Sequence, residues 1–301
     1  VLNDPVLLRL TEDEFWFSIS DSDLLLWLQG VNVTKKYDVV IDEIDVCPVQ
    51  IQGPLSENLM AKLAGEELRD VPYYGIMETQ IGGADVVISQ TGFTGEKGYE
   101  IYVRDAHQNA EKVWNAVLEG GEEFGLMVIA PAHHRRIAAG ILSWGQDLDH
   151  ETSPFQVNLA YQVPRNKSAD YIGKEALEKQ RAMIDEGTPP FKMRMVGITL
   201  GGKEITDYAP DFWLIADTDG NDMGYVTSPW WSPELGTNIA LAWVPWASSD
   251  IGTKLLVRLP DEFSVSPGVP VDGEIVDVPF RESVNPNKRE VQSAKGLDFA
   301  D

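Results

Sequence analysis

With 301 residues and a mass of 33.4 kDa, the chain is too long for a minimal binding module and long enough for two or three packed domains. Apolar residues make up 43% and charged residues 24%, which suits a globular interior and excludes a disordered chain. The net charge of −24 repels nucleic acid and anionic membrane surfaces, so we expect neither as a partner.

The first 186 residues alternate strand-like and helix-like patterns, which predicts an α+β region. Aromatic and β-branched residues predict a hairpin at 6–20, and the helix that follows is expected to begin at Asp21 or Ser22 and to end at Gly30. The further elements expected here are strands at 38–44 and 49–52, a helix from Pro54 to Gly65, a hairpin at 85–103, and helices at 106–119, 130–143 and 173–184.

The pattern changes after the breaker at 187–190, where short strands with turn residues replace the helices. The strands expected are 193–200, 213–216, 223–227, 239–244, 254–259 and 274–278. Their spacing predicts a small barrel or sandwich. We therefore place a domain boundary near 186–191, which gives a first region at 1–186, a second domain at 191–283 and a tail at 284–301.

The cysteine content and the start of the chain bound its environment. Cys47 is the single cysteine, which excludes an intramolecular disulfide and a cysteine-built metal centre and favours a reducing cytoplasm. No apolar run approaches the roughly 20 residues of a membrane helix, and no signal-peptide pattern is present. The chain begins at Val1 without a Met and runs directly into strand-like residues, which predicts that an N-terminal portion is missing.

A glycine-rich segment at 90–100, between two strand-like runs, is the densest unusual motif. Glycine permits a tight bend that leaves room for a ligand. Phe93 offers a flat apolar face there. Glu100 offers a carboxylate that can accept two parallel N–H bonds, and a 2-aminopyrimidinone ring such as a pterin presents that donor pair. The alternative is an ordinary exposed hairpin with a solvated glutamate.

Three other residues are candidates for chemistry. Asp4, fixed by the following proline, could orient or deprotonate an amine, or could be only a turn-former. Arg136 is expected to meet a carboxylate, either in a ligand or in an internal ion pair, and we favour the internal pair. Trp144 opens an acidic loop that fails the spacing of a calcium site; it could help to enclose a cationic or flat substrate, or could belong to the core.

Familiar catalytic and metal-binding patterns are missing from the sequence. There is no dinucleotide fingerprint, P-loop, nucleophile elbow or His-Glu-x-x-His motif. His133 and His134 are adjacent on a predicted helix and point about 100° apart, so they are a poor pair of ligands. We expect no bound metal.

Taken in order, six segments across nearly the whole chain resemble the tetrahydrofolate-dependent aminomethyltransferase family, which includes the T-protein of the glycine cleavage system. The segments are 48–54, 91–100, 145–154, 171–177, 224–233 and 279–280. The resemblance implies folate-binding domains around a central channel, a C-terminal β-barrel after about residue 191, and tetrahydrofolate as the cofactor. It also implies that a further stretch normally precedes this start.

The resemblance assigns roles to particular residues. Asp4 matches the catalytic aspartate near N5 of the folate. Phe93 matches the aromatic neighbour of the pterin, and Glu100 the glutamate that pairs with the pterin edge. Beyond these matches, we expect Trp144 and Arg281 to contact the folate and Trp16 and Arg136 to contact the substrate.

Departures from the T-protein pattern favour the branch that includes dimethylsulfoniopropionate demethylase. The T-protein sequence Ala-Arg-Asp is here Pro131-Ala132-His133, and its Asp-Asp is Asn3-Asp4. The resemblance therefore implies methyl transfer from a small sulfonium to N5 of tetrahydrofolate. The alternatives are aminomethyl transfer in glycine cleavage, with a lipoyl carrier protein as partner, an aromatic O-demethylase, and a folate-binding protein without turnover.

Overall fold

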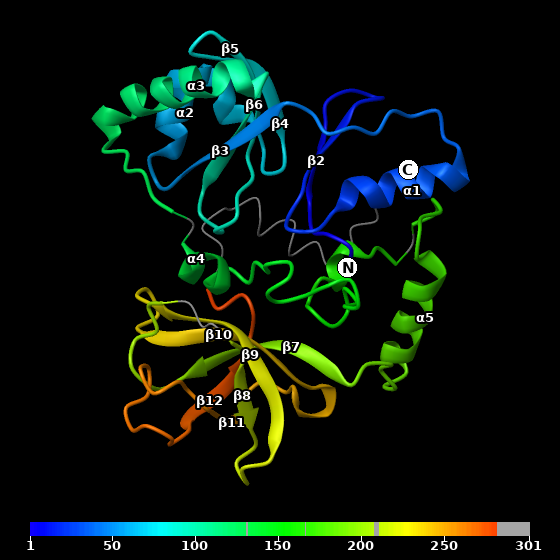
Figure 1. Ribbon diagram of the computed structural model, residues 1–301, viewed down its shortest axis with the longest axis vertical. Helices are drawn as coiled ribbons and strands as arrows, with labels where there is room; N and C mark the ends of the chain where they lie inside the picture. Colours follow the sequence, from blue (N-terminus) through cyan, green and yellow to red (C-terminus); the bar gives the residue numbers. More distant parts are fainter. Residues whose placement is uncertain (131, 166, 208–210, 282–301) are drawn as a thin grey trace. The chain divides into compact units, whose positions relative to one another are not determined.

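A computed structural model describes residues 1–130, 132–165, 167–207 and 211–281, and these form two compact units (Figure 1). One unit comprises residues 2–132. The other comprises Val1 and residues 133–281. Within the described ranges, no helix combines the length and the apolar character that crossing a bilayer requires.

The first unit is built on an antiparallel sheet in the order β3-β6-β5-β4. The strands are β3 (Val46–Gln52), β4 (Ile76–Ile81), β5 (Ala84–Ser89) and β6 (Gly98–Arg104), and the helices are α2 (Ser56–Ala64) and α3 (Ala106–Gly121), with short 3₁₀ turns at Glu66–Asp70 and Glu122–Phe124. Figure 1 shows α2 and α3 side by side over the sheet. Alternate residues of β6, such as Tyr99 and Ile101, enter the core that these helices close.

A hairpin packs against side chains from the other face of this sheet. It consists of β1 (Val6–Arg9) and β2 (Phe15–Ser18), and α1 (Leu24–Lys35) follows it. Leu8 and Trp16 of the hairpin form a buried cluster with Val87 of β5 and Tyr102 of β6. Tyr102 and Glu100 are two residues apart on β6, so their side chains share this face.

The second unit contains an antiparallel barrel whose strands close in the order β10-β7-β12-β11-β8-β9, so the predicted barrel is confirmed. The strands are β7 (Met193–Leu200), β8 (Trp213–Ala216), β9 (Asp222–Ser232), β10 (Thr237–Pro245), β11 (Lys254–Val257) and β12 (Val271–Val276), and a 3₁₀ turn at Trp246–Ser248 follows β10. Alternate side chains fill the interior, including Ile198, Ile215 and Val257. The expected α+β class with a C-terminal barrel describes this chain.

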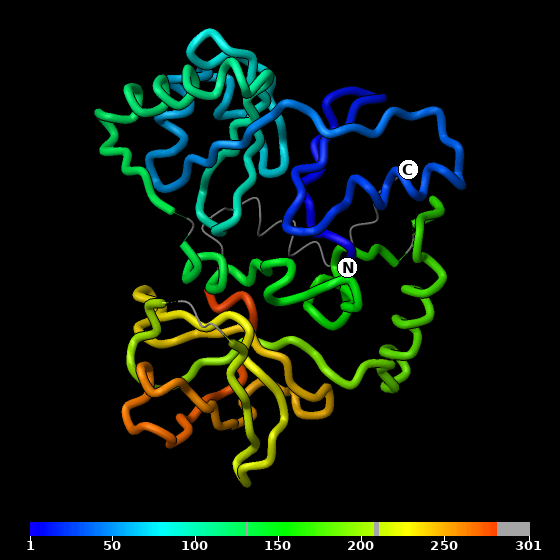
Figure 2. Tube along the Cα trace, in the orientation of Figure 1, coloured from blue at the N-terminus to red at the C-terminus, as the bar shows by residue number. Residues whose placement is uncertain are grey.

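A second apolar cluster lies on the outside of the barrel. Helix α4 (His133–Ala138) contributes Ile137, which packs with Leu241 and Trp243 of β10. A mostly irregular segment with a 3₁₀ turn at Ala160–Gln162 leads from α4 to α5 (Lys174–Asp185), as the tube in Figure 2 shows.

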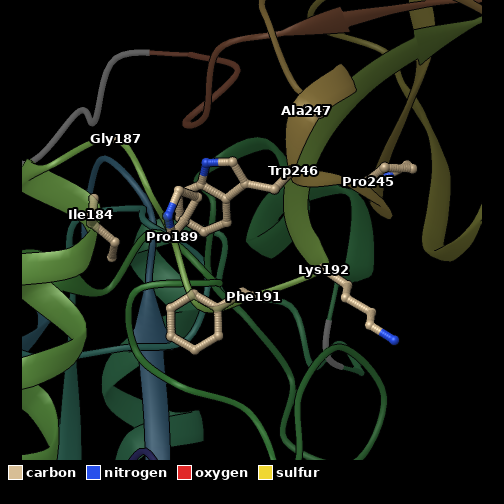
Figure 3. Close-up of a pocket in the computed structure, with 8 residues that line it drawn as sticks. All are labelled: Ile184, Gly187, Pro189, Phe191, Lys192, Pro245, Trp246 and Ala247. Carbon is tan, nitrogen blue, oxygen red and sulfur yellow. The ribbon is translucent and has the colours of Figure 1, made fainter.

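A surface cavity of about 440 Å³ lies where the end of α5 meets the segment before β7 and the turn after β10 (Figure 3). The rings of Phe191 and Trp246 line it with their centroids 5.8 Å apart. Among the described residues that line it, Lys192 is the charged one, and none of them is a predicted site residue. A cavity without a carboxylate does not offer the acceptor that we expect for a pterin.

Several element boundaries differ from the predictions. Residues 39–44 form no strand, and Val40 is 87% exposed. Strand β4 was not predicted. Helix α1 continues through Gly30 until Lys36 adopts a left-handed conformation, and α4 is much shorter than the predicted helix at 130–143. The division into compact units falls at residue 132, and the boundary near 186–191 stays a prediction.

Candidate functional site

Glu100 lies at the centre of a row of residues that crosses the sheet. Its neighbours in register are Gln50 on β3 and Ser89 on β5. Its carboxylate is half-buried, and the opposite face of the sheet is closed by α2 and α3. Glu100 is therefore held on a rigid strand, on the face that does not contact these helices.

Two hydroxyl groups donate to the same oxygen of this carboxylate. The Tyr102 hydroxyl lies 3.0 Å from Oε2 of Glu100, and the Thr91 hydroxyl donates to that oxygen as well. Within the described residues, no hydrogen bond reaches Oε1. A carboxylate offers about four acceptor positions, so Oε1 is left to accept N–H bonds from a ligand.

Burial and the adjacent Glu100 charge raise the pKa of Tyr102 strongly, and the hydroxyls of Ser18 and Thr91 oppose the rise only in part. The phenol therefore keeps its proton and remains a donor at neutral pH. Leu8 and Trp16 of the hairpin pack with the Tyr102 ring, so the hairpin contacts the residue that holds Glu100.

The glycine-rich bend lies over β3. A Cβ atom on Gly92 would lie 2.5 Å from Nε2 of Gln50, which shows how closely the bend approaches that strand. Lys97 is bonded to Glu57 of α2, and the Ser56 hydroxyl donates to the Lys97 carbonyl oxygen. These contacts fix the base of the bend. Phe93, at its tip, is 38% exposed and presents an apolar face to incoming molecules.

Asp4 belongs to the same unit as Glu100 and lies just before β1. The neighbouring amide of Asn3 accepts a hydrogen bond from the Ser20 backbone N–H at 3.2 Å and donates to the Ser22 hydroxyl at 2.7 Å. This clamp extends the β1–β2 pairing toward Asp4. Val6 and Leu8 contribute to the cluster against the sheet. Asp4 lies two residues before β1, and its catalytic role stays a prediction.

Trp16 lies in the core instead of at a surface. Its indole is 9% exposed, packs with Leu8 and Tyr102, and carries the Arg104 guanidinium 4.5 Å from its ring centroid. Its Nε1 donates to Glu14. The expected contact with substrate stays a prediction, and this packing does not support it.

Arg136 forms the internal ion pair that we favoured. Its Nη1 lies 2.6 Å from Oδ2 of Asp147, with side-chain exposures of 3% and 0%. Its Nη2 donates to the Ser228 hydroxyl of β9. Contact with a substrate carboxylate would require this buried pair to open.

Trp144 and Arg281 belong to the unit that contains the barrel. Trp144 is half-buried, packs on the outer barrel cluster and donates to the Val1 carbonyl oxygen at 3.2 Å. Arg281 is bonded to Glu234 at 3.1 Å. Their contacts with folate stay predictions.

Sequence reasoning did not single out Tyr102, and it gave Thr91 no role. Tyr102 stands two residues after Glu100, so strand alternation alone would have placed both side chains on one face. The described residues contain no group of three or more His, Cys, Asp or Glu side chains arranged to hold a metal ion.

Comparisons with known proteins agree with this architecture. Residues 1–167 match the model described as "GCVT N-terminal domain", and residues 194–280 match "Glycine cleavage T-protein C-terminal barrel domain". Dimethylsulfoniopropionate demethylase DmdA of Ruegeria pomeroyi is 33% identical over 87% of this chain and 68% of its own length. An aminomethyltransferase of a Geobacillus species is 29% identical over 82% of this chain and 69% of its own length.

A solved structure shows the same fold. The crystal structure of glycine cleavage system aminomethyltransferase T from Bartonella henselae superposes with a TM-score of 0.68 at 23% identity and covers 94% of this chain and 73% of the other. The two family regions together account for most of the sequence. The chain belongs to the glycine cleavage T-protein family.

Proposed function

We propose that this chain is a tetrahydrofolate-dependent one-carbon transferase that moves a methyl group from a small sulfonium, such as dimethylsulfoniopropionate, to N5 of tetrahydrofolate. The observation that carries the proposal is the Glu100 carboxylate, half-buried on a rigid strand with one oxygen left for a ligand. The relative named as a dimethylsulfoniopropionate demethylase supports the choice of donor.

The residues around Glu100 suit a reduced pterin. The edge of the 2-aminopyrimidinone ring carries adjacent N–H donors, and Glu100 supplies the acceptor. Because Gly92 has no side chain, the bend can lie close to Gln50. Phe93, the next residue on the bend, provides a flat apolar surface. Phe93 and Glu100 would therefore bind and orient the ring.

Bound tetrahydrofolate would supply the N5 lone pair, which forms the new N–CH₃ bond as the C–S bond breaks and the sulfur takes the electron pair. This chain contributes alignment, because a sulfonium is already an activated leaving group and needs no proton from the protein. Asp4 would steer N5 or take up its proton. Apolar walls such as Phe93 would exclude water from the reacting atoms.

The experiment is to incubate the protein with tetrahydrofolate and a panel of sulfonium, aminomethyl-lipoyl and methoxy-aromatic donors, and to identify the folate product by mass. We expect 5-methyltetrahydrofolate from the sulfonium. A 5,10-methylene product would show aminomethyl transfer, the reaction for which the Geobacillus relative is named. If folate binds but no donor gives a product, the chain is a folate-binding protein without turnover.

Two variants make the test specific to the proposed site. Glu100→Gln replaces an anionic acceptor with a mixed donor and acceptor and should weaken tetrahydrofolate binding by about 1.5–3 kcal/mol, the range for a hydrogen bond to a charged group. Glu78→Gln is the matched control, since Glu78 is exposed on β4 of the same sheet and bonds to Arg104 at 2.8 Å. Equal affinities of the two variants for tetrahydrofolate would show that Glu100 does not bind it.

A further inference from the structure

The two donors to Glu100 belong to different parts of the fold. Tyr102 is 3% exposed and packs between strand β5 and the hairpin, through Val87, Leu8 and Trp16. Its ring cannot turn without opening that cluster. Thr91 is buried as well, at 4% exposed, but it lies on the glycine-rich bend, whereas Tyr102 belongs to strand β6. The donor held by the sheet is therefore the tyrosine.

Both hydroxyls use Oε2, and this has a geometric consequence for Glu100. A glutamate has three side-chain torsions, and a half-buried one could orient its carboxylate in several ways. A fixed phenol 3.0 Å from Oε2 selects one of them and directs Oε1 away from the protein donors. Holding the acceptor in place before the ligand arrives removes part of the ordering cost of binding.

We propose that Tyr102 is a positioning residue for the pterin: its hydroxyl holds Oε2 of Glu100 so that Oε1 faces the N–H donors at the 2-amino edge of the ring. This inference rests on the proposed function and adds to it the residue that orients the acceptor. Tyr102 touches Glu100 and not the ligand. The hairpin reaches the site through the same ring, because Leu8 and Trp16 pack with it.

The chain offers a closely matched control on the same strand. Tyr99 is also buried, and its hydroxyl also makes a side-chain hydrogen bond, at 3.3 Å from Nε2 of Gln90. It is three residues before Tyr102, so it faces the helices α2 and α3 instead of Glu100. Tyr102→Phe and Tyr99→Phe therefore remove the same group from opposite faces of one sheet.

The test measures dissociation constants for tetrahydrofolate and for 2-desamino-2-methyl-tetrahydrofolate, an analogue without the 2-amino donor. Tyr102→Phe should raise the dissociation constant for tetrahydrofolate about tenfold, which corresponds to the loss of one charge-assisted hydrogen bond. The dissociation constant for the analogue should change much less. Tyr99→Phe should leave the ratio of the two constants as in the unmodified protein. Unfolding midpoints of both variants show whether they fold.

Each other outcome has a distinct meaning. If Tyr102→Phe weakens both ligands by the same factor, the tyrosine acts only through the stability of the sheet, and the positioning role is refuted. Unchanged affinity for tetrahydrofolate refutes it as well. If the unmodified protein binds neither ligand, the folate function itself fails. Should Tyr102→Phe not fold, Thr91→Val tests the same orientation of Oε2 from the bend, and an equal loss for both ligands again refutes the proposal.

Discussion

The buried pair of Arg136 and Asp147 gives the sharpest test of what holds the segment after α4 to the barrel. Asp147 accepts four hydrogen bonds: Oδ2 from Arg136 at 2.6 Å and from the Ser143 backbone N–H at 2.8 Å, and Oδ1 from Thr227 at 2.6 Å and Ser228 at 2.5 Å. All four acceptor positions of the carboxylate are used. Two of these donors belong to β9, so one carboxylate joins the segment after α4 to the barrel.

Asp147→Ala should lower the free energy of unfolding by about 3–5 kcal/mol, because it leaves the Arg136 guanidinium buried without its counter-charge. Asp185→Ala is the matched control. Arg165 and Asp185 also form an ion pair at 2.7 Å, but their side chains are 60% and 49% exposed, so the loss should not exceed about 1 kcal/mol.

Urea unfolding monitored by circular dichroism measures both losses, provided that the dependence of the unfolding free energy on urea concentration is the same for both variants. The double variant Arg136→Met with Asp147→Leu should recover most of the loss, since no unpaired charge remains. Equal, small losses for Asp147→Ala and Asp185→Ala would refute the reasoning. So would a double variant that is less stable than Asp147→Ala.

Two further predictions concern the glycine-rich bend. Gly98→Ala should cost several times more stability than Gly92→Ala in a urea titration, because the new Cβ would lie 2.6 Å from the Ile51 carbonyl oxygen, which is backbone, whereas at Gly92 it meets only the movable Gln50 amide. The hydrogen bond from Lys97 lowers the pKa of Glu57 below the ordinary value of 4.5, and Arg69 adds to the effect. This pair should therefore stabilise the fold by up to about 1 kcal/mol above pH 4.5, and the contribution should be lost as the pH falls through the lowered value. The difference between the unmodified protein and Glu57→Gln, measured from pH 7 down to pH 3, should shrink toward zero; a constant difference would contradict the assignment.

Local patterns predict the strands of the barrel and the hairpin at 6–20, because residue alternation and turn residues agree there. The strand expected at 38–44 is wrong for a physical reason: β-branched residues there find no neighbouring strand, and Val39 and Val40 remain exposed. The missed strand β4 had a usable signal, since Gly82-Gly83 joins it to β5 in a two-residue turn.

The candidate site was predictable in part. A carboxylate at the start of a strand after a glycine-rich bend drew attention to Glu100 and Phe93. What the sequence could not show is which neighbours hold that carboxylate, because Thr91 and Tyr102 are ordinary bend and strand residues until the fold brings their hydroxyls to one oxygen. For Arg136 the sequence favoured an internal ion pair over a ligand contact but did not identify the partner. The structure identifies it as Asp147, eleven residues away.

On our proposal, relatives named for two different reactions can align with one chain because the reactions share one pterin site. Glu100, Thr91 and Tyr102 are fixed by β5, β6 and the hairpin, and all of them belong to residues 2–132. On our proposal they recognise the pterin, which both reactions would share, and they make no choice between a sulfonium and an aminomethyl donor. That choice must come from side chains that contact the leaving group. Identity at these three residues is therefore weak evidence for the donor, and the mass of the folate product is the measurement that separates the two reactions.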